Sequence, residues 1–419
     1  MKFFSKPLFT GFAPNIEPAD VRKACRYLLL PWNWHLLRSG TGAEHVEKKL
    51  CKYFWVPYAK TFDSGRSALF HALKTLDVGE GDEVLVQAYT CVVVINAIHW
   101  AGATPVYVDV LDNFTMDPAD ALKKINPKTK SIMLQHTFGV PADINKLLAL
   151  AKTHGLSTIE DCAHALGGMY NKKFLGTYAD IGMFSFGTDK SISCGRGGAL
   201  ITNNTALAKK ISTRHARLPR MDTAQLFHHL WHFPIFYIAK PVYNIFVGKL
   251  LLACAKKFHI THRIISNEEK QGRQQICYPA TLAHPLADIL TYQFDILDKK
   301  NAHRIHIANI YRKYVHPKVV QPLKDYTLVV PLRYPLLLQE PTQLHRYAKQ
   351  QGIILGDWYQ TVVAPADSTG AHTQYISGSC PRAETLAQQS INLPTHSGIT
   401  EKDAYRIVEV VNTYITHVS

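Results

Sequence analysis

The chain has 419 residues, of which 47% are hydrophobic and 19% are charged. This balance is typical of a globular protein with a sizeable core and excludes a disordered or fibrous chain. Lysine and arginine (47) outnumber aspartate and glutamate (32), so the formal net charge is +15. The basic residues occur in dispersed pairs and no zinc-finger or RNA-recognition signature accompanies them, so a nucleic-acid partner is not expected.

The cysteines indicate a reducing compartment. There are eight of them, scattered along the chain without CxxC pairs, and several lie in apolar runs. We interpret them as free thiols in the cytosol and expect no metal site. The start of the sequence also lacks the long apolar stretch of a secretory signal.

Between about residues 60 and 205, short β-rich runs alternate with helical patterns, and turn sequences at 79–82 and 102–103 separate them. This alternation predicts an α/β fold with a doubly wound, mainly parallel sheet, whose ligands bind at the carboxyl ends of the strands. The predicted helices are 67–76 and 92–100, and the predicted strands are 84–87, 105–110, 132–135, 157–160, 183–186 and 199–202.

Residues 221–258 differ from this alternation. The segment is rich in aromatic and apolar residues, but Pro234, Pro241, Lys240 and Lys249 interrupt it. A single membrane-spanning helix is therefore not expected. Two interpretations remain open: helices that pack on the protein's own body or on a partner subunit, or a basic, aromatic interfacial element that rests on a membrane.

The last part of the chain has the pattern of a second, smaller domain. A long helical pattern at 288–314 predicts a helix that links the two domains. Strand runs at 327–331 and 336–338 and a last helix at 400–415 follow it. The predicted parts of the chain are an N-terminal segment at 1–59, a large domain at 60–290 that contains the apolar insert, and a linker helix with a small C-terminal domain at 291–419.

Two residues indicate the chemistry. Asp161 follows a predicted strand, and Lys190 follows the next one about thirty residues later, before a glycine cluster at 195–198. A lysine amine can bond to the aldehyde of pyridoxal 5'-phosphate, and a carboxylate can keep the pyridine nitrogen protonated, so that the ring accepts electrons from a carbanion. The sequence therefore predicts a pyridoxal-phosphate site with Lys190 and Asp161 as catalytic residues. An ordinary surface lysine and a helix-capping aspartate are the alternatives.

A phosphate cradle is predicted where the chain enters the first helix of this region. Gly65 lies at that turn, so backbone N–H groups and the helix dipole can bind a phosphate, with Arg66 or Ser67 adding donors. Ser185 can supply a hydroxyl to the same phosphate, and His164 can lie against the cofactor ring or the substrate. A helix cap, an ordinary strand serine and a structural histidine are the respective alternatives.

These residues together resemble the DegT/StrS-type family of pyridoxal-phosphate aminotransferases, best known for acting on nucleotide sugars. The resemblance is close over residues 60–205 and looser at 391–396. The matching stretches are 64–69, 81–84, 102–109, 136–143, 160–167 and 184–198, of which the last two are the most specific.

The resemblance implies a fold type I transferase, in which the large domain has a mainly parallel seven-stranded sheet and the small C-terminal domain is α+β. It implies that Lys190 is the Schiff-base lysine, which then moves the proton, and that Asp161 is the partner of the pyridine nitrogen. It also implies a homodimer with active sites at the subunit interface. The other implied cofactor-binding residues are His164 beside the ring and Ser185, Gly65, Arg66 and Ser67 facing the phosphate.

The implied reaction moves an amino group from an amino donor, typically glutamate, to a keto sugar for surface polysaccharide biosynthesis. The alternatives are an enzyme with a non-sugar acceptor and a cofactor-binding regulatory or membrane-associated assembly protein. Retention of both Lys190 and Asp161 favours an enzyme, because a binding module needs no protonated ring beside a lysine. The expected location is the cytoplasm, on the inner face of the membrane if 221–258 is interfacial.

The chain also departs from the family pattern. Cys91 stands where much of the family has an aromatic residue that stacks on the ring, so we expect Tyr89 or another aromatic ring to do this. Arg196 replaces an acidic residue of the glycine cluster. Trp358-Tyr359 stands in place of a His-Tyr-Pro segment, and we expect both residues, like His396, to pack within the small domain.

Overall fold

A seven-stranded sheet forms the centre of the molecule in the computed structural model, which describes residues 7–243, 246–258, 260, 265–275, 278–323, 326, 329–368 and 370–418. The strand order is β2-β11-β10-β7-β6-β3-β5. Among the described strands of this sheet, only β11 runs opposite to the others, which confirms the mainly parallel α/β sheet. The strands are β2 (Tyr58–Phe62), β3 (Glu83–Gln87), β5 (Thr104–Val108), β6 (Thr129–Gln135), β7 (Ser157–Asp161), β10 (Ile181–Ser185) and β11 (Gly198–Thr202).

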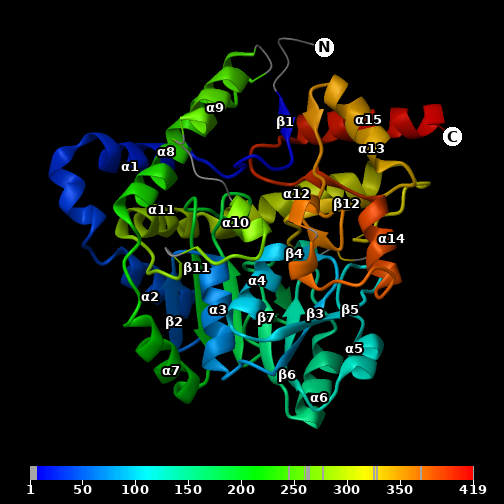
Figure 1. The fold of residues 1–419 in the computed structure, drawn as a ribbon. Helices are drawn as coiled ribbons and strands as arrows, with labels where there is room; N and C mark the ends of the chain where they lie inside the picture. Colours follow the sequence, from blue (N-terminus) through cyan, green and yellow to red (C-terminus); the bar gives the residue numbers. More distant parts are fainter. Residues whose placement is uncertain are drawn as a thin grey trace.

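Helices cover both faces of this sheet (Figure 1). Successive side chains of β3 alternate between the two cores, Val84 and Val86 in one and Leu85 in the other. Strands buried on both faces are rich in consecutive apolar residues, as residues 84–86 of β3 and 132–134 of β6 are. One core includes α3 (Gly65–Thr75), α4 (Val92–Trp100) and α7 (Thr205–His215), and the other includes α2 (Gly42–Phe54), α5 (Pro118–Lys124), α6 (Ile144–His154) and α11 (His284–Asp295).

The predicted helices agree with the structure except for one. The helix predicted at 92–100 has the bounds of α4, and the one predicted at 67–76 begins earlier, at Gly65, because Ser64 caps it. The single helix predicted at 288–314 is wrong: α11 ends at Asp295 and α12 (Leu297–Tyr314) begins after Ile296. Neither glycine nor proline marks this break, so the helical pattern runs through it in the sequence.

The C-terminal elements lie above the sheet (Figure 1, orange and red). Of the strand predicted at 327–331, residues 327–328 lie outside the described residues and 329–331 are not in a strand. The core beneath these elements is continuous with that of the sheet, so the division into domains remains a prediction. The elements are the antiparallel pair β12 (Arg333–Leu337) and β15 (Ser390–Pro394), the strands β13 (Ile353–Ile354) and β14 (Val363–Ala364), and the helices α13 (Pro341–Gln350), α14 (Pro381–Gln389), α15 (Glu401–Val418), η3 (Ala366–Ser368) and η4 (Ala371–Thr373).

Short elements complete the described chain. Before the sheet come β1 (Leu8–Phe9), α1 (Pro18–Leu29) and the 3₁₀ helix η1 (Pro31–Leu37). The first of these pairs with β13, which ties the N-terminal segment to the C-terminal elements. Farther along the chain lies β4 (Thr90–Cys91), which pairs with β14. It is followed by η2 (Thr137–Gly139) and by the hairpin of β8 (Met169–Tyr170) and β9 (Lys173–Phe174).

The apolar insert at 221–258 folds into two helices, α8 (Thr223–Ala239) and α9 (Val247–Lys257), and α10 (Asn267–Lys270) follows them. Pro234 lies inside α8. Leu226, Leu230 and Phe233 of α8 are buried in the core, and α1 packs against the same helix. Among the helices that the structure describes, none has the length and apolar character needed to cross a bilayer.

Candidate active site

A cavity of about 850 Å³ opens at the carboxyl ends of β7 and β10, where ligands bind in sheets of this kind. Lys190 and Asp161 both line it. Of the other predicted site residues, Gly65, Arg66, Ser185 and His164 line this cavity, whereas Ser67 and Tyr89 do not.

The loop after β10 carries Lys190 and is held by the N-terminal segment. The side-chain amide of Asn15 donates to the carbonyl oxygen of Lys190. The backbone N–H of Ala13 donates to Oδ1 of Asp189 at 3.1 Å. Arg304 in turn donates to Oδ1 of Asn15 at 3.1 Å, from a guanidinium that is buried in the core. The lysine backbone is therefore fixed, while its side chain faces the cavity.

Asp161 and Lys190 influence each other's charge. Burial raises the pKa of Asp161, and the N–H of Ala163, which donates to its Oδ1 at 2.9 Å, and the charge of Lys190 oppose that rise. Burial lowers the pKa of Lys190, and the charge of Asp161 opposes that fall. A carboxylate whose pKa is raised by burial is stabilised in its charged form by a cationic group placed against it, such as a protonated pyridine nitrogen.

The start of α3 forms the predicted phosphate cradle. Ser64 caps the helix, since its hydroxyl accepts from the N–H of Ser67 at 3.3 Å. A Cβ at Gly65 would lie 2.8 Å from Cβ of Ser185, so any larger residue would fill the space in front of the helix N-terminus. This space, the N-terminal N–H groups and the Ser185 hydroxyl fit a phosphate.

Two of the residues predicted to face the phosphate have other partners. The hydroxyl of Ser67 lies 2.9 Å from that of Ser64, which places it in the cap rather than in the cavity. The guanidinium of Arg66 forms a buried ion pair with Glu269 of α10. Arg66 still lines the cavity, so it can contribute its charge to an anion bound there.

Arg196 was not among the predicted site residues, yet it lines the cavity beside the cradle. Its guanidinium carbon lies 3.9 Å from the centre of the Tyr278 ring, and its Nε lies 3.5 Å from Oδ2 of Asp63. The side chain is 6% exposed, and its Nη2 has no hydrogen-bond partner among the described residues. A buried donor of this kind fits an anion in the cradle.

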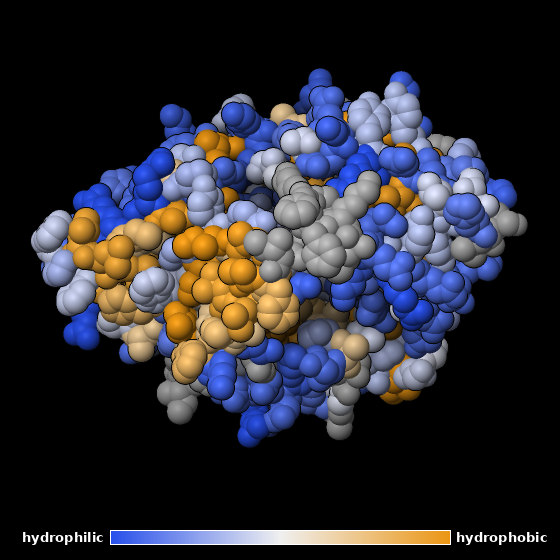
Figure 2. All heavy atoms as spheres, turned by 90° about the horizontal axis from the view of Figure 1, so that it is seen from above, coloured by the Kyte–Doolittle hydropathy of each residue, from blue (hydrophilic) through white to orange (hydrophobic). Residues whose placement is uncertain are grey.

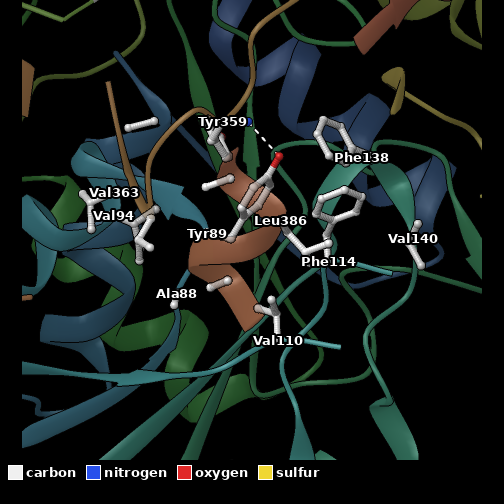
Figure 3. Packing of buried hydrophobic residues seen from close by; sticks show 14 of the residues in the cluster. Ala88, Tyr89, Val94, Val110, Phe114, Phe138, Val140, Tyr359, Val363 and Leu386 are labelled. Atoms are coloured by element: carbon white, nitrogen blue, oxygen red, sulfur yellow. Dashed lines mark hydrogen bonds between the residues drawn. The ribbon is translucent and has the colours of Figure 1, made fainter. Parts of the chain in front are cut away.

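The ring-stacking role expected for Tyr89 does not fit its position. Tyr89 is completely buried and packs against Phe114 and Phe138, as Figure 3 shows. Its hydroxyl accepts from the N–H of Tyr359 at 2.8 Å and donates to Ser390. The backbone of Tyr89 has a positive φ of 66°, which turns the side chain into the core. Thr90 and Cys91 of the same stretch line the cavity instead.

Trp358 and Tyr359 line the cavity too, so the expectation that they only pack within the C-terminal part is wrong. The indole of Trp358 is stacked on His164, with ring centres 5.2 Å apart, and Nζ of Lys190 lies 5.2 Å from the indole ring. The guanidinium of Arg333 lies 3.4 Å from the same ring. Trp358 therefore joins the C-terminal elements to Lys190.

His164 is buried and uncharged. Its Nδ1 accepts from the N–H of Phe138 at 3.3 Å. Burial lowers the pKa of His164 well below its usual value, and the charges of Lys190 and Arg333 act in the same direction. A neutral imidazole can lie against an aromatic ring. His396, by contrast, makes a structural contact as expected, because its Nε2 lies 2.7 Å from the carbonyl oxygen of Phe9.

The outer wall of the cavity is provided by the insert. It is cationic and polar, and Lys270 of α10 is paired there with Asp367 at 2.5 Å. The residues of the insert, of α10 and of the segment between them that line the wall are His228, His229, His232, Lys256, Ile265, Asn267 and Lys270.

His136, Glu160 and Cys162 form a buried group within reach of one metal ion. Glu160, however, already accepts hydrogen bonds from the N–H groups of Gly176, Tyr178 and Ala179 and lies 3.0 Å from His136. These hydrogen bonds to Glu160 hold the loop after β9 in place. A structural role therefore accounts for the cluster of His136, Glu160 and Cys162.

Solved structures share this fold. One is the putative sugar aminotransferase Spr1654 from Streptococcus pneumoniae in its PMP form, with a TM-score of 0.74, 20% identity and coverage of 97% of this chain and 98% of that one. The architecture is thus that of the fold type I pyridoxal-phosphate transferases, as the sequence predicted. The sequence model of the DegT/DnrJ/EryC1/StrS aminotransferase family matches residues 28–238 and 251–412, and the chain belongs to this family.

Two of the curated relatives are named as sugar enzymes. The chain is 40% identical over 200 residues to a GDP-perosamine synthase of Escherichia coli O157:H7, a match that covers 47% of this chain and 54% of the relative. It thus spans about half of that relative's length. A dTDP-3-amino-3,6-dideoxy-alpha-D-galactopyranose transaminase of Aneurinibacillus thermoaerophilus is 28% identical over 393 residues, which is 92% of this chain and 93% of the relative.

Proposed function

We propose that this protein is a pyridoxal-phosphate-dependent aminotransferase that moves an amino group from an amino acid, glutamate in our proposal, to a nucleotide-linked keto sugar for surface polysaccharide biosynthesis. The observation that carries the proposal is that Lys190, Asp161 and the cradle at Gly65 line one cavity. The names of the relatives support the acceptor class.

When bound, pyridoxal phosphate supplies an aldehyde that bonds to amines and a pyridinium ring that takes up the electron pair left by a departing proton. In our proposal, the carboxylate of Asp161 holds the proton on the ring nitrogen, and the start of α3 with Ser185 binds the phosphate. His164 lies on one side of the ring, and Cys91 and Trp358 line the cavity with it.

The amine of Lys190 is proposed to move the proton at the substrate carbon that carries the amino group. This role requires a neutral amine at working pH, and burial lowers the pKa of Lys190 in that direction. The ring of Trp358 lies 5.2 Å from Nζ, beside this amine. When the amine takes up the proton, the charge of Asp161 stabilises the ammonium that forms.

The size and charge of the cavity support an anionic acceptor. Its volume of about 850 Å³ is near the upper end for small-molecule sites. Arg66 and Arg196 lie toward the cofactor end, and Lys256 and Lys270 lie in the wall from the insert. Cations at both ends favour a substrate with phosphate groups over a simple keto acid.

A half-reaction screen tests this proposal. The protein is loaded with pyridoxamine phosphate, nucleotide-linked keto sugars or simple keto acids are added, and the return of the aldehyde absorbance is recorded. We expect return with a nucleotide-linked keto sugar and no comparable return with 2-oxoacids other than 2-oxoglutarate. If only simple keto acids restored the absorbance, the sugar acceptor would be wrong while the aminotransferase chemistry stood.

We also propose a second copy of the chain as partner, in a homodimer, and the cytoplasm as location. Seven described cysteines are free thiols, which supports a reducing compartment. In our proposal residues 221–258 bring the protein to the inner face of the membrane. Multi-angle light scattering of the purified protein tests the dimer, because it distinguishes one 47.1 kDa chain from two.

A further inference from the structure

An exposed apolar surface covers the side of the molecule formed by α1, η1, α8 and α9. Figure 2 shows apolar atoms gathered over this region when the molecule is viewed from above. Trp32 is 69% exposed and Phe246 is 66% exposed, which is far from the burial that such side chains usually reach. The members of this surface, here called the apolar face, are Leu29, Trp32, Trp34, Trp231, Tyr237, Ile238, Phe246, Val247 and Leu250.

The apolar face is built from two segments that are distant in the sequence. One is the end of α1 with η1, and the other is the end of α8 with α9. Helix α1 packs on α8, and α8 packs on α9, so the two segments belong to one folded unit. Phe12 joins them from the N-terminal segment, with its ring 5.0 Å from that of Phe236. The exposed side chains are thus held on a structured support.

Acidic residues are absent from the sequence of both segments. Residues 21–43 contain neither aspartate nor glutamate, and the same is true of residues 223–258. Five exposed cations accompany the apolar side chains: Arg22, Arg26, Arg38, Lys256 and Lys257.

We propose that the apolar face binds the surface of an anionic phospholipid membrane, with Trp32, Trp34 and Phe246 entering the headgroup region and the cations meeting lipid phosphates. Tryptophan is enriched at this depth of a bilayer, and basic amphipathic helices lie in its plane. Since none of the described helices can cross a bilayer, the contact is interfacial.

The charges favour a membrane over a second copy of the chain. In a symmetric dimer the same patch occupies both sides of the contact, so a dimer through this face would gather the cations of two copies, and neither segment supplies a carboxylate to pair with them. Like charges gathered in one contact suppress such pairing. An anionic bilayer satisfies both the apolar and the basic side chains.

The contact also concerns the candidate active site. His232 of α8 and Lys256 of α9 line the cavity, while the apolar face lies on the same two helices. A membrane that receives α8 and α9 therefore lies next to the outer wall of the cavity. The membrane proposal does not depend on the reaction, because it rests on the surface alone.

Vesicle co-sedimentation of the full-length protein tests the proposal. We expect the protein to pellet with vesicles of phosphatidylglycerol and phosphatidylcholine, and to pellet at least about tenfold less with phosphatidylcholine alone or in high salt. The variant Trp32→Ser/Trp34→Ser should reduce the apparent affinity by about tenfold or more. The matched control is Trp55→Asn, which removes an indole that is 88% exposed at the end of α2, outside the apolar face, and should bind as the parent does.

Two results would overturn the proposal. One is a parent protein that pellets no better with anionic vesicles than with neutral ones. The other is equal loss of binding in Trp55→Asn and in Trp32→Ser/Trp34→Ser, since the effect would then not belong to this face. Circular dichroism shows whether each variant is folded, and Arg22→Gln/Arg26→Gln is a second test that leaves the apolar side chains in place. Parent-like binding by that variant would contradict the role of the cations.

Discussion

At the scale of single residues, the proposed chemistry depends on two side chains that neighbouring strands bring to one cavity. Asp161 stands at the end of β7 and Lys190 follows β10, and these strands are adjacent and parallel. The register of the sheet therefore places the carboxylate and the amine at the same edge. The raised pKa of Asp161 and the lowered pKa of Lys190 both result mainly from burial.

Asp161→Asn should separate binding from chemistry. An asparagine keeps the shape of the side chain but cannot hold a proton on a ring nitrogen by its charge. We expect the variant to bind pyridoxal phosphate and to lose about 10³-fold or more of the rate of the half-reaction with glutamate. Stopped-flow absorbance measures that rate, and a rate within a few fold of the parent would contradict the role.

Arg196→Ala should weaken binding of the cofactor phosphate. Loss of a buried charged donor costs about 1.5–3 kcal/mol, which is about 10- to 100-fold in affinity. The measurement is the dissociation constant for pyridoxal phosphate and for pyridoxal, which lacks the phosphate. The preference for the phosphorylated form should shrink in Arg196→Ala and be partly retained in Arg196→Lys. An unchanged preference would remove Arg196 from the phosphate site.

Much of the site could be predicted from the sequence, because the motif residues lie close to strand ends. Gly65, Ser185 and His164 are examples, and all three line the cavity. Trp358 could not be placed, since it enters the cavity from the C-terminal elements across a long stretch of chain. The burial of Tyr89 in the core could not be predicted, and neither could its positive φ.

At the scale of elements, the N-terminal segment is the support of the lysine loop. Asn15 joins the carbonyl oxygen of Lys190 to the buried guanidinium of Arg304. This role could not be predicted from the sequence, because Asn15 is separated from Lys190 by 175 residues and from Arg304 by 289 residues. The break at Ile296 was likewise missed, since the helical pattern continues through it.

Asn15→Ala should loosen this loop. The change leaves one donor of Arg304 and the carbonyl of Lys190 without their partner, which costs about 1–3 kcal/mol of unfolding free energy. We expect a lower urea midpoint and a faster exchange of the N–H of Lys190 in hydrogen-exchange experiments. Asn33→Ala, which removes a hydrogen bond from Asn33 of η1 to the carbonyl oxygen of Arg26 in α1, is a control that should leave that exchange unchanged.

At the scale of the whole molecule, acid should destabilise the fold through buried histidines. His71 of α3 is buried against Phe62, with ring centres 5.2 Å apart, and neither ring nitrogen has a hydrogen-bond partner among the described residues. Burial lowers the pKa of His71 to about 4. The unfolded chain thus binds a proton that the folded chain does not between pH 6.5 and about 4, and stability falls as pH falls through that window.

His71→Phe should remove this contribution, because phenylalanine keeps the stacked ring and cannot bind a proton. The unfolding free energy that His71 costs the parent in acid amounts to about 3 kcal/mol at most. Asp20, whose pKa burial raises to about 6, acts in the opposite direction, so the comparison is between variant and parent. The difference in free energy of unfolding between pH 7.5 and pH 5, measured by urea unfolding, should be smaller for His71→Phe than for the parent. An identical difference would show that His71 is not a source of the acid sensitivity.

The most direct test of the central claim is a borohydride trap of the protein incubated with pyridoxal phosphate. The parent should show a visible absorbance band, lose it on reduction, and yield a peptide that carries the cofactor on Lys190. Lys190→Ala should show neither the band nor the labelled peptide. A label on another lysine, or retention of the band in Lys190→Ala, would contradict the account.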